Sequence, residues 1–390
     1  MITRYLQQYL VEDLKEKMVF VSGPRQVGKT TLSKDIGAEF YKDGYLYLCW
    51  DHKDDKKLIL KGTWPADKKL IILDEIHKYP KWKNFIKGEH DKNKELFRIL
   101  VTGSAKLDIY RKGGDSLQGR YYPLRLHPFS VAELSSNKTK EFKVLKELEF
   151  REANHEIFEI LFHFGGFPEP YKNQNQRFLR RWQKNRLDRL INDDIKSVQF
   201  LKDITSIEIL VSLLPSKVGS LFSLNSLRED LHVSHETMAS WVEILEKFYY
   251  HFRIYPFVNK LNGSYKKEPK LFLWDWSEVV DKGARLENMV AGHLLKFCHF
   301  LQDVEGFDVN LNFLKNKPSH EVDFLVTVKN EPWFCVEVKN SIEKNLTSLK
   351  YYGRGLKIPY KYQVVNVRDV DYIKDGVRVM SVEKFLTGLV

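Results

Sequence analysis

The sequence predicts an α/β protein of two or three domains. Over residues 1 to about 135, short apolar strands alternate with helical stretches, the strands reading MVFVS, YLYLCW, KLIILD and FRILVTG. This alternation is typical of a parallel sheet covered by helices. A helical region and a mixed region of helices and strands follow. The 390 residues are too many for one ordinary hydrophobic core.

Four parts are expected along the chain. Residues 1–135 form the first α/β domain, which ends at the polar run SSNKTKEFK. Residues 136–203 are helical in pattern, rich in Arg and Lys, and read as a lid or linker. Residues 204–270 read as three helices, an aromatic strand and a polar loop. Residues 271–390 combine one helix with several strands and end in another helix.

The composition favours packed cores and a polyanionic partner. Apolar residues make up 43% of the chain and aromatic residues 13%, which argues against disorder. Lys and Arg number 63 against 52 Asp and Glu, a net charge of +11 that suits nucleic acid, although a merely basic protein has the same excess. Three widely separated cysteines indicate neither a disulfide framework nor a CxxC metal site. We expect a cytoplasmic protein without membrane association, because no signal core or membrane-spanning run is present.

A phosphate-binding loop is the strongest motif. GPRQVGKT, residues 23–30, matches G-x-x-x-x-G-K-[ST] after the strand MVFVS and before a helical stretch. The glycines let backbone N–H groups point at phosphate oxygens, and the helix N-terminus adds positive potential. Lys29 would neutralise the β and γ phosphates of ATP, and Thr30 would bind Mg²⁺. The alternative is a glycine turn before a helix. The predicted ATP-binding residues here are Gly23, Pro24, Arg25, Gln26, Val27, Gly28, Lys29, Thr30 and Thr31.

Two further strand ends complete the predicted ATP site. LIILDE is an apolar strand that ends in Asp74 and Glu75. Asp74 would hold Mg²⁺ through water, and Glu75 would orient or polarise the attacking water. The strand FRILVTGS ends in Thr102 and Ser104, either of which could touch the γ-phosphate. The alternatives are an acid-capped strand end and an ordinary turn.

Together these motifs resemble a family of prokaryotic AAA-type ATPases that carry a C-terminal domain of unknown function. The resemblance rests on GPRQVGKTTL, LDEIHKYPKW, LVTGS and LQGRYYPLRLHPFSVAEL, and GGFPEP and the segments discussed below also fit it. It therefore covers nearly the whole chain. It implies a P-loop NTPase sheet of AAA type, ATP and Mg²⁺ as cofactors, and a sensor role for Thr102 or Ser104. Arg120, in LQGR, is similar to the family's Gly-Arg and is a candidate arginine finger in cis or on a neighbouring subunit of an oligomer, or else a structural arginine.

The middle of the chain has the rhythm of a winged helix. In residues 223–257, Ser234 is a good helix N-cap before a second helix. The apolar positions of this helix and its end fall on one face. They are Met238, Trp241, Leu245 and Phe248. The outward positions of the candidate recognition helix are His235, Glu236, Thr237 and Ser240. We expect double-stranded DNA contact, with protein docking as the alternative. The basic segment 177–190 could bind phosphates, line the ATPase or be a solvated helix face.

A hairpin near the end of the chain, EVDFLVTVKNEPWFCVEVKN, carries the pattern D–x(13)–E–x–K. This pattern resembles the PD-(D/E)XK nuclease core, although the residue before Asp323 is Val rather than Pro. The resemblance implies that Asp323 and Glu337 hold Mg²⁺, that Lys339 orients water or stabilises charge, and that Glu287 on a preceding helix adds a further acid. A plain four-residue loop puts Asp323 opposite Val338, on the wrong face, so convergence requires a bulge or an odd-length loop. The alternative is a structural acid–lysine pair or an inactive nuclease fold.

The leading hypothesis from the sequence is an AAA-type ATPase that acts on DNA, with a metal-dependent nuclease site in the C-terminal domain. The alternative is an ATP-dependent switch that binds a protein partner and keeps an inactive nuclease-like fold. Metal binding at Glu337 separates the two hypotheses.

Overall fold

The computed structural model describes residues 2–103, 117–135, 141–196, 203–258, 268–316, 320–343 and 345–390. The chain divides into two compact units. The first comprises Met1–His127 with Lys247–Tyr249, and the second comprises Pro128–Glu246 with Tyr250–Val390. Our four-part division of the chain remains a prediction.

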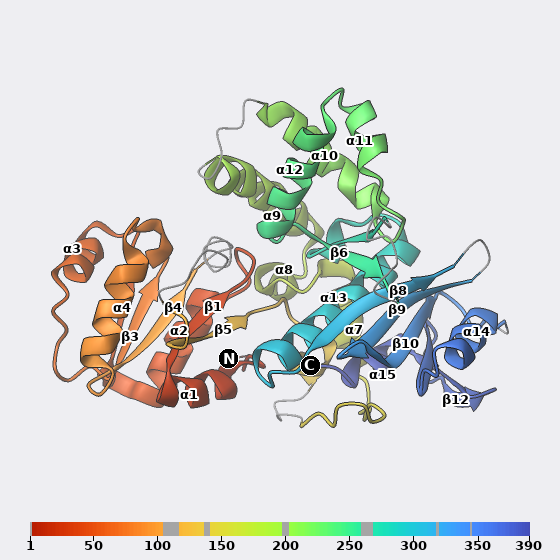
Figure 1. The fold of residues 1–390 in the computed structure, drawn as a ribbon, viewed down its shortest axis with the longest axis horizontal. Helices are drawn as coiled ribbons and strands as arrows, with labels where there is room; N and C mark the ends of the chain where they lie inside the picture. Colours follow the sequence, from red (N-terminus) through yellow and green to blue (C-terminus); the bar gives the residue numbers. More distant parts are fainter. Residues whose placement is uncertain are drawn as a thin grey trace. The chain divides into compact units, whose positions relative to one another are not determined.

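A parallel five-stranded sheet forms the centre of the first unit, with strand order β2-β3-β4-β1-β5 (Figure 1). The strands are β1 (Met18–Ser22), β2 (Tyr45–Cys49), β3 (Leu70–Asp74), β4 (Arg98–Thr102) and β5 (Tyr121–Arg125). Every residue of β1 and β3 is buried. Strands that are apolar at successive positions need cover on both faces, which only the interior of such a sheet provides. The predicted parallel α/β sheet is confirmed.

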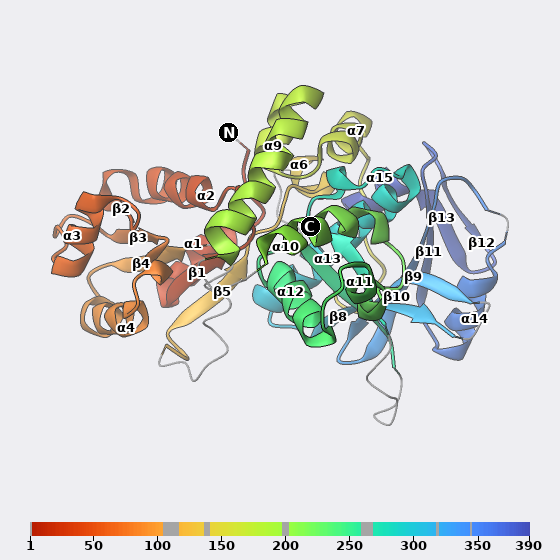
Figure 2. The same cartoon turned by 90° about the horizontal axis from the view of Figure 1, so that it is seen from above.

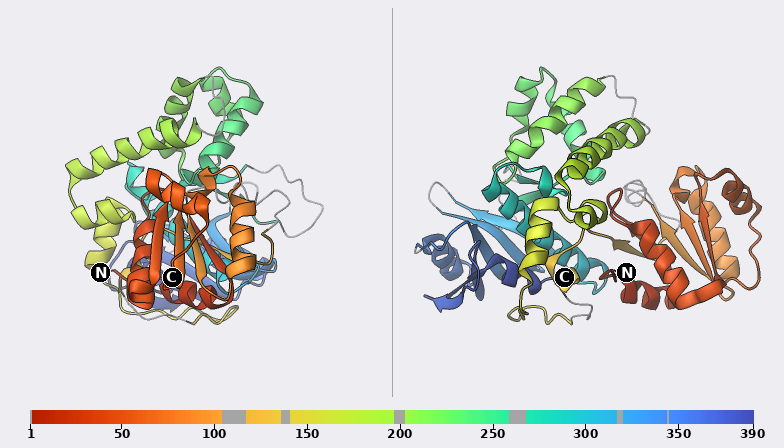
Figure 3. Two further views of the ribbon diagram at one scale, coloured as in Figure 1. Left: turned by 90° about the vertical axis from the view of Figure 1, so that its left-hand side faces the viewer. Right: turned by 180° about the vertical axis from the view of Figure 1, so that it is seen from behind.

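Helices cover this sheet (Figures 1 and 3). The longer ones are α1 (Gln7–Glu16), α2 (Lys29–Ile36), α3 (Lys53–Lys61) and α4 (Trp82–Asn93), and shorter turns span Gly37–Tyr41, Lys42–Gly44 and Ile76–Lys78. Ile59 of α3 and Ile86 of α4 share one hydrophobic cluster with Phe20, Leu73 and Ile99. Helices α1 and α2 contact each other, α1 also contacts β1 and β4, and α2 contacts β4. These contacts fix the helices against the sheet.

The second unit begins with a helical region. Its helices are α6 (Val131–Ser135), α7 (His155–Phe164), α8 (Pro168–Asn173), α9 (Gln176–Arg189) with a π-helical extension (Leu190–Ile195), α10 (Ile204–Leu213) with a 3-10 turn (Leu214–Lys217), α11 (Leu224–Asp230) and α12 (His235–Lys247). Side-chain caps start several of them: Asn154 accepts from Ile157 N–H, Asn175 from Phe178 N–H, and Asp203 from Ser206 N–H.

Three of these helices precede an antiparallel strand pair, β6 (His251–Pro256) and β7 (Lys270–Leu273). Ser234 caps α12 by accepting from Thr237 N–H at 3.1 Å, as predicted. The four apolar positions predicted for the inner face, Met238, Trp241, Leu245 and Phe248, are buried. His235 and Glu236 are exposed, and Thr237 and Ser240 are half-buried. This order of elements is the one that a winged helix requires, and the assignment itself remains a prediction.

The rest of the second unit is a mixed sheet of eight strands, ordered β12-β13-β11-β10-β9-β8-β6-β7 (Figure 2). The remaining elements are a short turn (Trp276–Glu278), α13 (Lys282–Asp303), β8 (Val309–Lys315), β9 (Glu321–Val328), β10 (Glu331–Lys339), α14 (Thr347–Gly355), β11 (Tyr360–Val365), β12 (Asp371–Lys374), β13 (Val377–Ser381) and α15 (Val382–Thr387). Strand β6 pairs with β8, so the β6–β7 hairpin is part of this sheet. Phe297 of α13 packs on Phe334 of β10, and Leu349 of α14 joins a separate cluster with Cys335.

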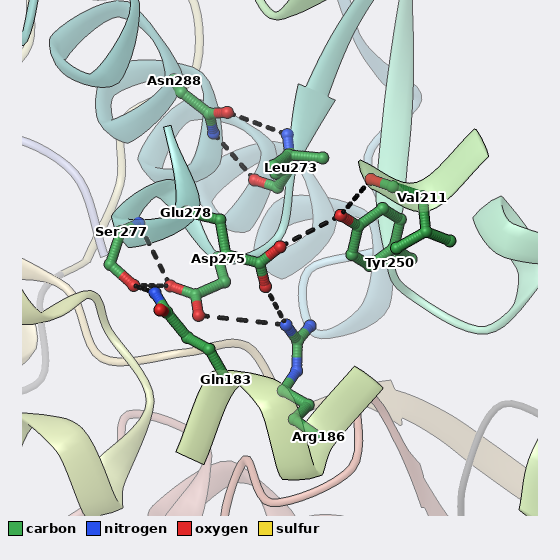
Figure 4. A network of polar contacts seen from close by, with 9 residues as sticks. All are labelled: Gln183, Arg186, Val211, Tyr250, Leu273, Asp275, Ser277, Glu278 and Asn288. Carbon is green, nitrogen blue, oxygen red and sulfur yellow. Dashed lines mark hydrogen bonds and ion pairs between the residues drawn. The ribbon is translucent and has the colours of Figure 1, made fainter. Parts of the chain in front are cut away.

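A buried polar network fastens α9 to the segment between β7 and α13 (Figure 4). Arg186 Nη1 donates to Glu278 Oε1 at 2.8 Å and lies 3.9 Å from Asp275 Oδ2. Tyr250 Oη donates to Glu278 Oε2 at 3.0 Å, and Ser277 donates to Asp275. Burial, chiefly, raises the pKa of Glu278 to about 7 although Arg186 opposes that rise. One guanidinium therefore holds two buried carboxyl groups.

Across the part of the chain that the structure describes, no helix combines the length and apolar character needed to cross a membrane.

Candidate functional site

The carboxyl ends of four parallel strands bring the predicted ATP-site residues together. Along this edge Cys49 of β2 pairs with Asp74 of β3, Asp74 pairs with Thr102 of β4, and Thr102 pairs with Val21 of β1. Parallel strands place their carboxyl ends at one edge, where ligands of open α/β sheets bind. The phosphate-binding loop follows β1 at this same edge.

Glycine is required at both ends of the loop. Gly23 has φ +144°, and a Cβ atom there would lie 2.4 Å from the carbonyl oxygen of Leu126. Gly28 has φ +99° and leads directly into α2. Both conformations are costly for residues with a side chain. Arg4 stabilises the loop conformation. Its guanidinium donates to the carbonyl of Val27 at 2.8 Å and to the carbonyl of His127 at 2.5 Å.

Lys29 already points into the loop. Its buried Nζ donates to the carbonyl oxygens of Gly23 at 2.9 Å and Pro24 at 2.7 Å. The ammonium is therefore placed beside backbone that a phosphate group would contact. Thr30 follows in the first turn of α2 and faces the strand edge, whereas Thr31 is exposed.

Asp74 accepts three hydroxyl hydrogen bonds. Thr30 Oγ1 donates to its Oδ2 at 2.8 Å, Tyr47 Oη donates to Oδ2 at 2.7 Å, and Thr102 Oγ1 donates to Oδ1 at 2.6 Å. A carboxylate and a hydroxyl in contact are the ligand types that Mg²⁺ takes beside phosphates and water. Thr30 and Asp74 therefore fit the predicted role of Mg²⁺ ligands. Thr102 contacts Asp74, which is consistent with the predicted sensor role.

Glu75 sits in a strained and partly enclosed position. Its backbone adopts φ +57°, unusual for a residue other than glycine, and its N–H donates to the carbonyl of Thr102 at 2.9 Å. Its Oε2 lies 3.4 Å from His77 Nε2 and 3.7 Å from Lys78 Nζ. Burial raises the pKa of Glu75, and the Lys78 and Lys29 charges oppose that rise. A carboxylate with a raised pKa beside a phosphate site is suited to accept a proton or a hydrogen bond from an attacking water.

Arg120 does not lie at this edge. It immediately precedes β5, whose first residue pairs with the first residue of β1, whereas the loop follows the last residue of β1. A five-residue strand, roughly 17 Å long, thus separates Arg120 from the loop. Arg120 instead forms an ion pair with Asp91, with Nε 2.7 Å from Oδ1. The structure thus shows Arg120 paired with Asp91, and its role as an arginine finger, in cis or on a neighbouring subunit, remains a prediction. Ser104 lies outside the described residues.

Two features of the site were missed by sequence reasoning. Tyr47 reaches Asp74 from β2, and burial together with this hydrogen bond raises the pKa of the Tyr47 hydroxyl. Arg4 reaches the loop from the N-terminal segment. Both are single residues outside any motif, so only strand pairing and tertiary contact could reveal them.

The C-terminal hairpin contains the predicted irregularity. Between β9 and β10 the register shifts between Pro332 and Phe334, after which Val336 pairs with Phe324. One step further along this register Glu337 comes beside Asp323 on the same face. Of the two irregularities predicted, a bulge or an odd-length loop, the structure has a bulge. Asp323 Oδ2 also accepts from Val338 N–H at 2.9 Å. Lys339 Nζ lies 3.3 Å from Glu337 Oε1.

Lys270, which sequence reasoning did not single out, lies among the acids of this region. Its Nζ is 2.7 Å from Glu321 Oε1, 3.1 Å from Glu287 Oε1 and 3.4 Å from Asp323 Oδ1. Burial by itself lowers the pKa of Lys270, but the charges of Asp323, Glu287 and Glu321 outweigh it, and the net shift is upward. Burial raises the pKa of Glu287 to about 8, with Asp323 adding to the rise.

The three acids predicted as metal ligands are neighbours but do not form a ready metal site. Among the residues that the structure describes, no group of three or more His, Cys, Asp or Glu side chains is placed to hold a metal ion. An ammonium group contacts Glu287 and Asp323 instead, while Glu337 contacts Lys339. The residues present therefore do not fit a resident divalent ion in this arrangement.

Comparison with family models covers most of the chain in three parts. Residues 15–135 match an AAA domain, residues 155–279 match a domain of unknown function (DUF8612), and residues 282–385 match a second domain of unknown function (DUF4143). The N-terminal part of the chain is therefore similar to an AAA domain, as the resemblance of its motifs implied. The P-loop, Asp74 and Glu75 all fall within it.

Similar proteins include two uncharacterized proteins of Methanocaldococcus jannaschii. One is 24% identical over 95% of this chain and 85% of its own length, and the other is 23% identical over 74% and 70%. Among solved structures, the Thermotoga maritima RuvB Holliday junction branch migration motor is 18% identical and covers 64% of this chain and 88% of its own, with a TM-score of 0.30. AMPPCP-bound DnaA from Aquifex aeolicus is 17% identical over 62% and 86%, with a TM-score of 0.31.

Proposed function

We propose that the chain is an Mg²⁺-dependent ATPase that acts on DNA. The observation that carries the ATPase assignment is the contact of Thr30 and Thr102 with Asp74 beside the phosphate-binding loop, with Glu75 next in the chain. An isolated glycine loop can be a simple turn, but a turn does not require a carboxylate, two hydroxyls and a lysine at one strand edge.

Each residue has a role in binding ATP or positioning water. Backbone N–H groups of the loop and of the α2 N-terminus hold the phosphates, and Lys29 neutralises the β and γ phosphates. Thr30 and Asp74 would hold Mg²⁺, which when bound would supply positive charge to the transferring phosphoryl group. Glu75 accepts a hydrogen bond from the attacking water and orients it in line with the γ-phosphate. Lys78 and His77 limit where the Glu75 carboxylate can point.

Substitution of Glu75 separates binding from turnover. We expect Glu75→Gln to bind ATP as tightly as the wild type, because the phosphate contacts remain, and to lose turnover by 10²-fold or more, an order of magnitude typical for loss of a catalytic base. Lys29→Ala is expected to lose ATP binding itself. Fluorescent-nucleotide binding and phosphate release measure the two effects. Full turnover in Glu75→Gln would remove Glu75 from the reaction.

Helix α9 supports DNA as the partner. Five basic side chains along it are exposed: Arg177, Arg180, Arg181, Lys184 and Arg189. Arg177, Arg181 and Lys184 recur at four and three residues, which places them on one face. The opposite face is anchored through Trp182 and Arg186, which are buried. A row of exposed cations on a fixed helix suits a phosphate backbone, and such contacts give binding that weakens steeply with salt.

The β6–β7 hairpin and helices α10–α12 support a winged helix, as proposed from the sequence. The exposed positions at the start of α12 include His235 and Glu236 but no Lys or Arg, so α9 is the stronger candidate for phosphate contact. In the alternative proposal, α12 docks a protein partner and ATP turnover switches that contact.

A nuclease-like fold remains our proposal for the C-terminal sheet. Its support is the succession of α13, three antiparallel strands, α14 and a parallel strand, with Asp323, Glu337 and Lys339 on the hairpin. Cleavage is not part of the proposal, because the acids do not form a metal site.

A further inference from the structure

Lys270 occupies the centre of the acidic cluster at the edge of the C-terminal sheet. The cluster consists of Glu287 on α13, Glu321 and Asp323 on β9, and Lys270 on β7. The lysine side chain is 3% exposed, and its Nζ has one carboxylate oxygen of each acid within 3.4 Å. An ammonium group has three donors and no acceptor, so three carboxylates satisfy it completely.

The acids are also held from outside. Asp323 Oδ2 accepts the Val338 N–H, and Lys315 Nζ contacts Glu321 Oε2 at 2.7 Å. A Cβ atom at Gly219 would lie 2.8 Å from Glu287 Oε2, so this glycine permits the backbone to close over the carboxyl group. Five of the six carboxylate oxygens of these acids are therefore already in contact with an ammonium group or a backbone N–H.

The position of Lys270 in the cluster is fixed by its surroundings. Lys270 is the first residue of β7, where it pairs with Ile254 of β6 and forms an isolated bridge with Leu221. Its Nζ also lies 5.7 Å from the centre of the Phe313 ring. These pairings fix the backbone from which the side chain extends. Withdrawal of the ammonium would leave three half-buried carboxylates close together without their shared counter-charge, which is unfavourable.

A divalent ion at this position would meet a fixed positive charge. At separations of about 3–4 Å like charges repel strongly wherever the surroundings exclude water. We propose that Lys270 is the resident cation of this cluster, that it takes the place of a divalent metal ion, and that its removal opens a site for Mn²⁺ or Mg²⁺. The cluster then has a structural role, in which its ion pairs connect β7, α13 and β9.

Metal titration of the full-length protein tests this proposal. Mn²⁺ binding is followed by calorimetry and by the electron spin resonance of free Mn²⁺. We expect the wild type and Asp323→Asn to bind the same number of Mn²⁺ ions, because no site in the wild type depends on Asp323. Lys270→Met is expected to gain one such site, with at least tenfold tighter binding than the wild type at this cluster, and Lys270→Met with Asp323→Asn is expected to lose it. Any site that persists in Asp323→Asn belongs elsewhere, such as the phosphate-binding loop.

Lys315→Met is the matched control, because Lys315 touches Glu321 from the solvent side and is 40% exposed. It is expected to gain no site. An Asp323-dependent Mn²⁺ site in the wild type overturns the proposal, as does a folded Lys270→Met variant without one. If Lys270→Met does not fold, Lys270→Gln is used in its place. If neither variant folds, the proposal is tested by the wild-type titration alone. ATP turnover has no part in this readout, so failure of the ATPase proposal is distinguishable from failure of this one.

Discussion

The buried imidazole of His293 uses both ring nitrogens in its neutral form. Nδ1 lies 2.7 Å from the carbonyl of Met289, to which it donates, and Nε2 accepts from Val131 N–H at 3.1 Å. Protonation of Nε2 would abolish the second bond. Burial, chiefly, lowers the pKa of His293 to about 3, even though the Met289 hydrogen bond opposes this. A single side chain thus links the stability of the second unit to pH.

We expect the free energy of unfolding to fall as pH falls from about 6.5 to about 3. In this window the unfolded chain binds a proton at His293 and the folded chain does not, so the folded state loses up to about 1.4 kcal/mol per pH unit from this group. His293→Asn should reduce the slope by about one proton. Urea unfolding at several pH values measures the slope. Equal slopes in the wild type and His293→Asn would contradict this assignment.

At the residue scale, motifs were predictable and their partners were not. The loop residues, Asp74, Glu75 and Thr102 follow from local patterns whose chemistry demands fixed spacing. Tyr47 reaches Asp74 across 27 residues of sequence, and Lys270 reaches Asp323 across 53. Nothing in the sequence near either residue records that contact.

Element packing decides what the polar groups of the second unit can do. The π-extended helix α9 carries its basic face to solvent because Arg186 and Trp182 hold its other face. The guanidinium of Arg186 also lies over the Phe167 ring, 4.5 Å from its centre. This one residue therefore joins α9, the Asp275–Glu278 turn and Tyr250.

Arg186→Met should destabilise the second unit by roughly 3–5 kcal/mol, because it leaves two buried carboxyl groups without their cation. Adding Glu278→Gln should recover part of the loss, because one of the two acids is then neutral. Arg189→Met, at an exposed position on the same helix, is the matched control and should change stability by less than about 0.5 kcal/mol. Denaturant unfolding measures all three. A loss below 1 kcal/mol in Arg186→Met would show that the network contributes little.

Strand register illustrates how far elements could be predicted. The need for a bulge in the hairpin followed from the two-residue period of side chains and from the acids that had to share a face. Its location, between Pro332 and Phe334, did not follow. Trp333, at the bulge, is buried and donates to the carbonyl of Lys146 at 2.7 Å, a contact 187 residues away in sequence. Long-range packing of this kind fixes a bulge and leaves no local pattern.

For the whole molecule, the net charge is +11. The proposed ATP site lies in the first compact unit, and helix α9, which we propose to contact DNA, lies in the second. The parallel sheet was predictable because its central strands are apolar at successive positions. The joining of the β6–β7 hairpin to the C-terminal sheet was not, because a short parallel pairing between β6 and β8 creates it. Coupling between ATP turnover and DNA is the central claim that this arrangement supports.

The most direct test is ATP turnover measured with and without duplex DNA at low salt. We expect duplex DNA to raise turnover by the wild type severalfold and to have no effect on Lys29→Ala, which should be inactive. Removal of the α9 charges Arg177, Arg181 and Lys184 by alanine should abolish the stimulation and keep the basal rate. The matched variant with alanine at the exposed residues Lys53, Lys61 and Lys92 should retain it. A Lys29-dependent rate that does not respond to DNA would contradict the account and favour a switch that binds a protein partner.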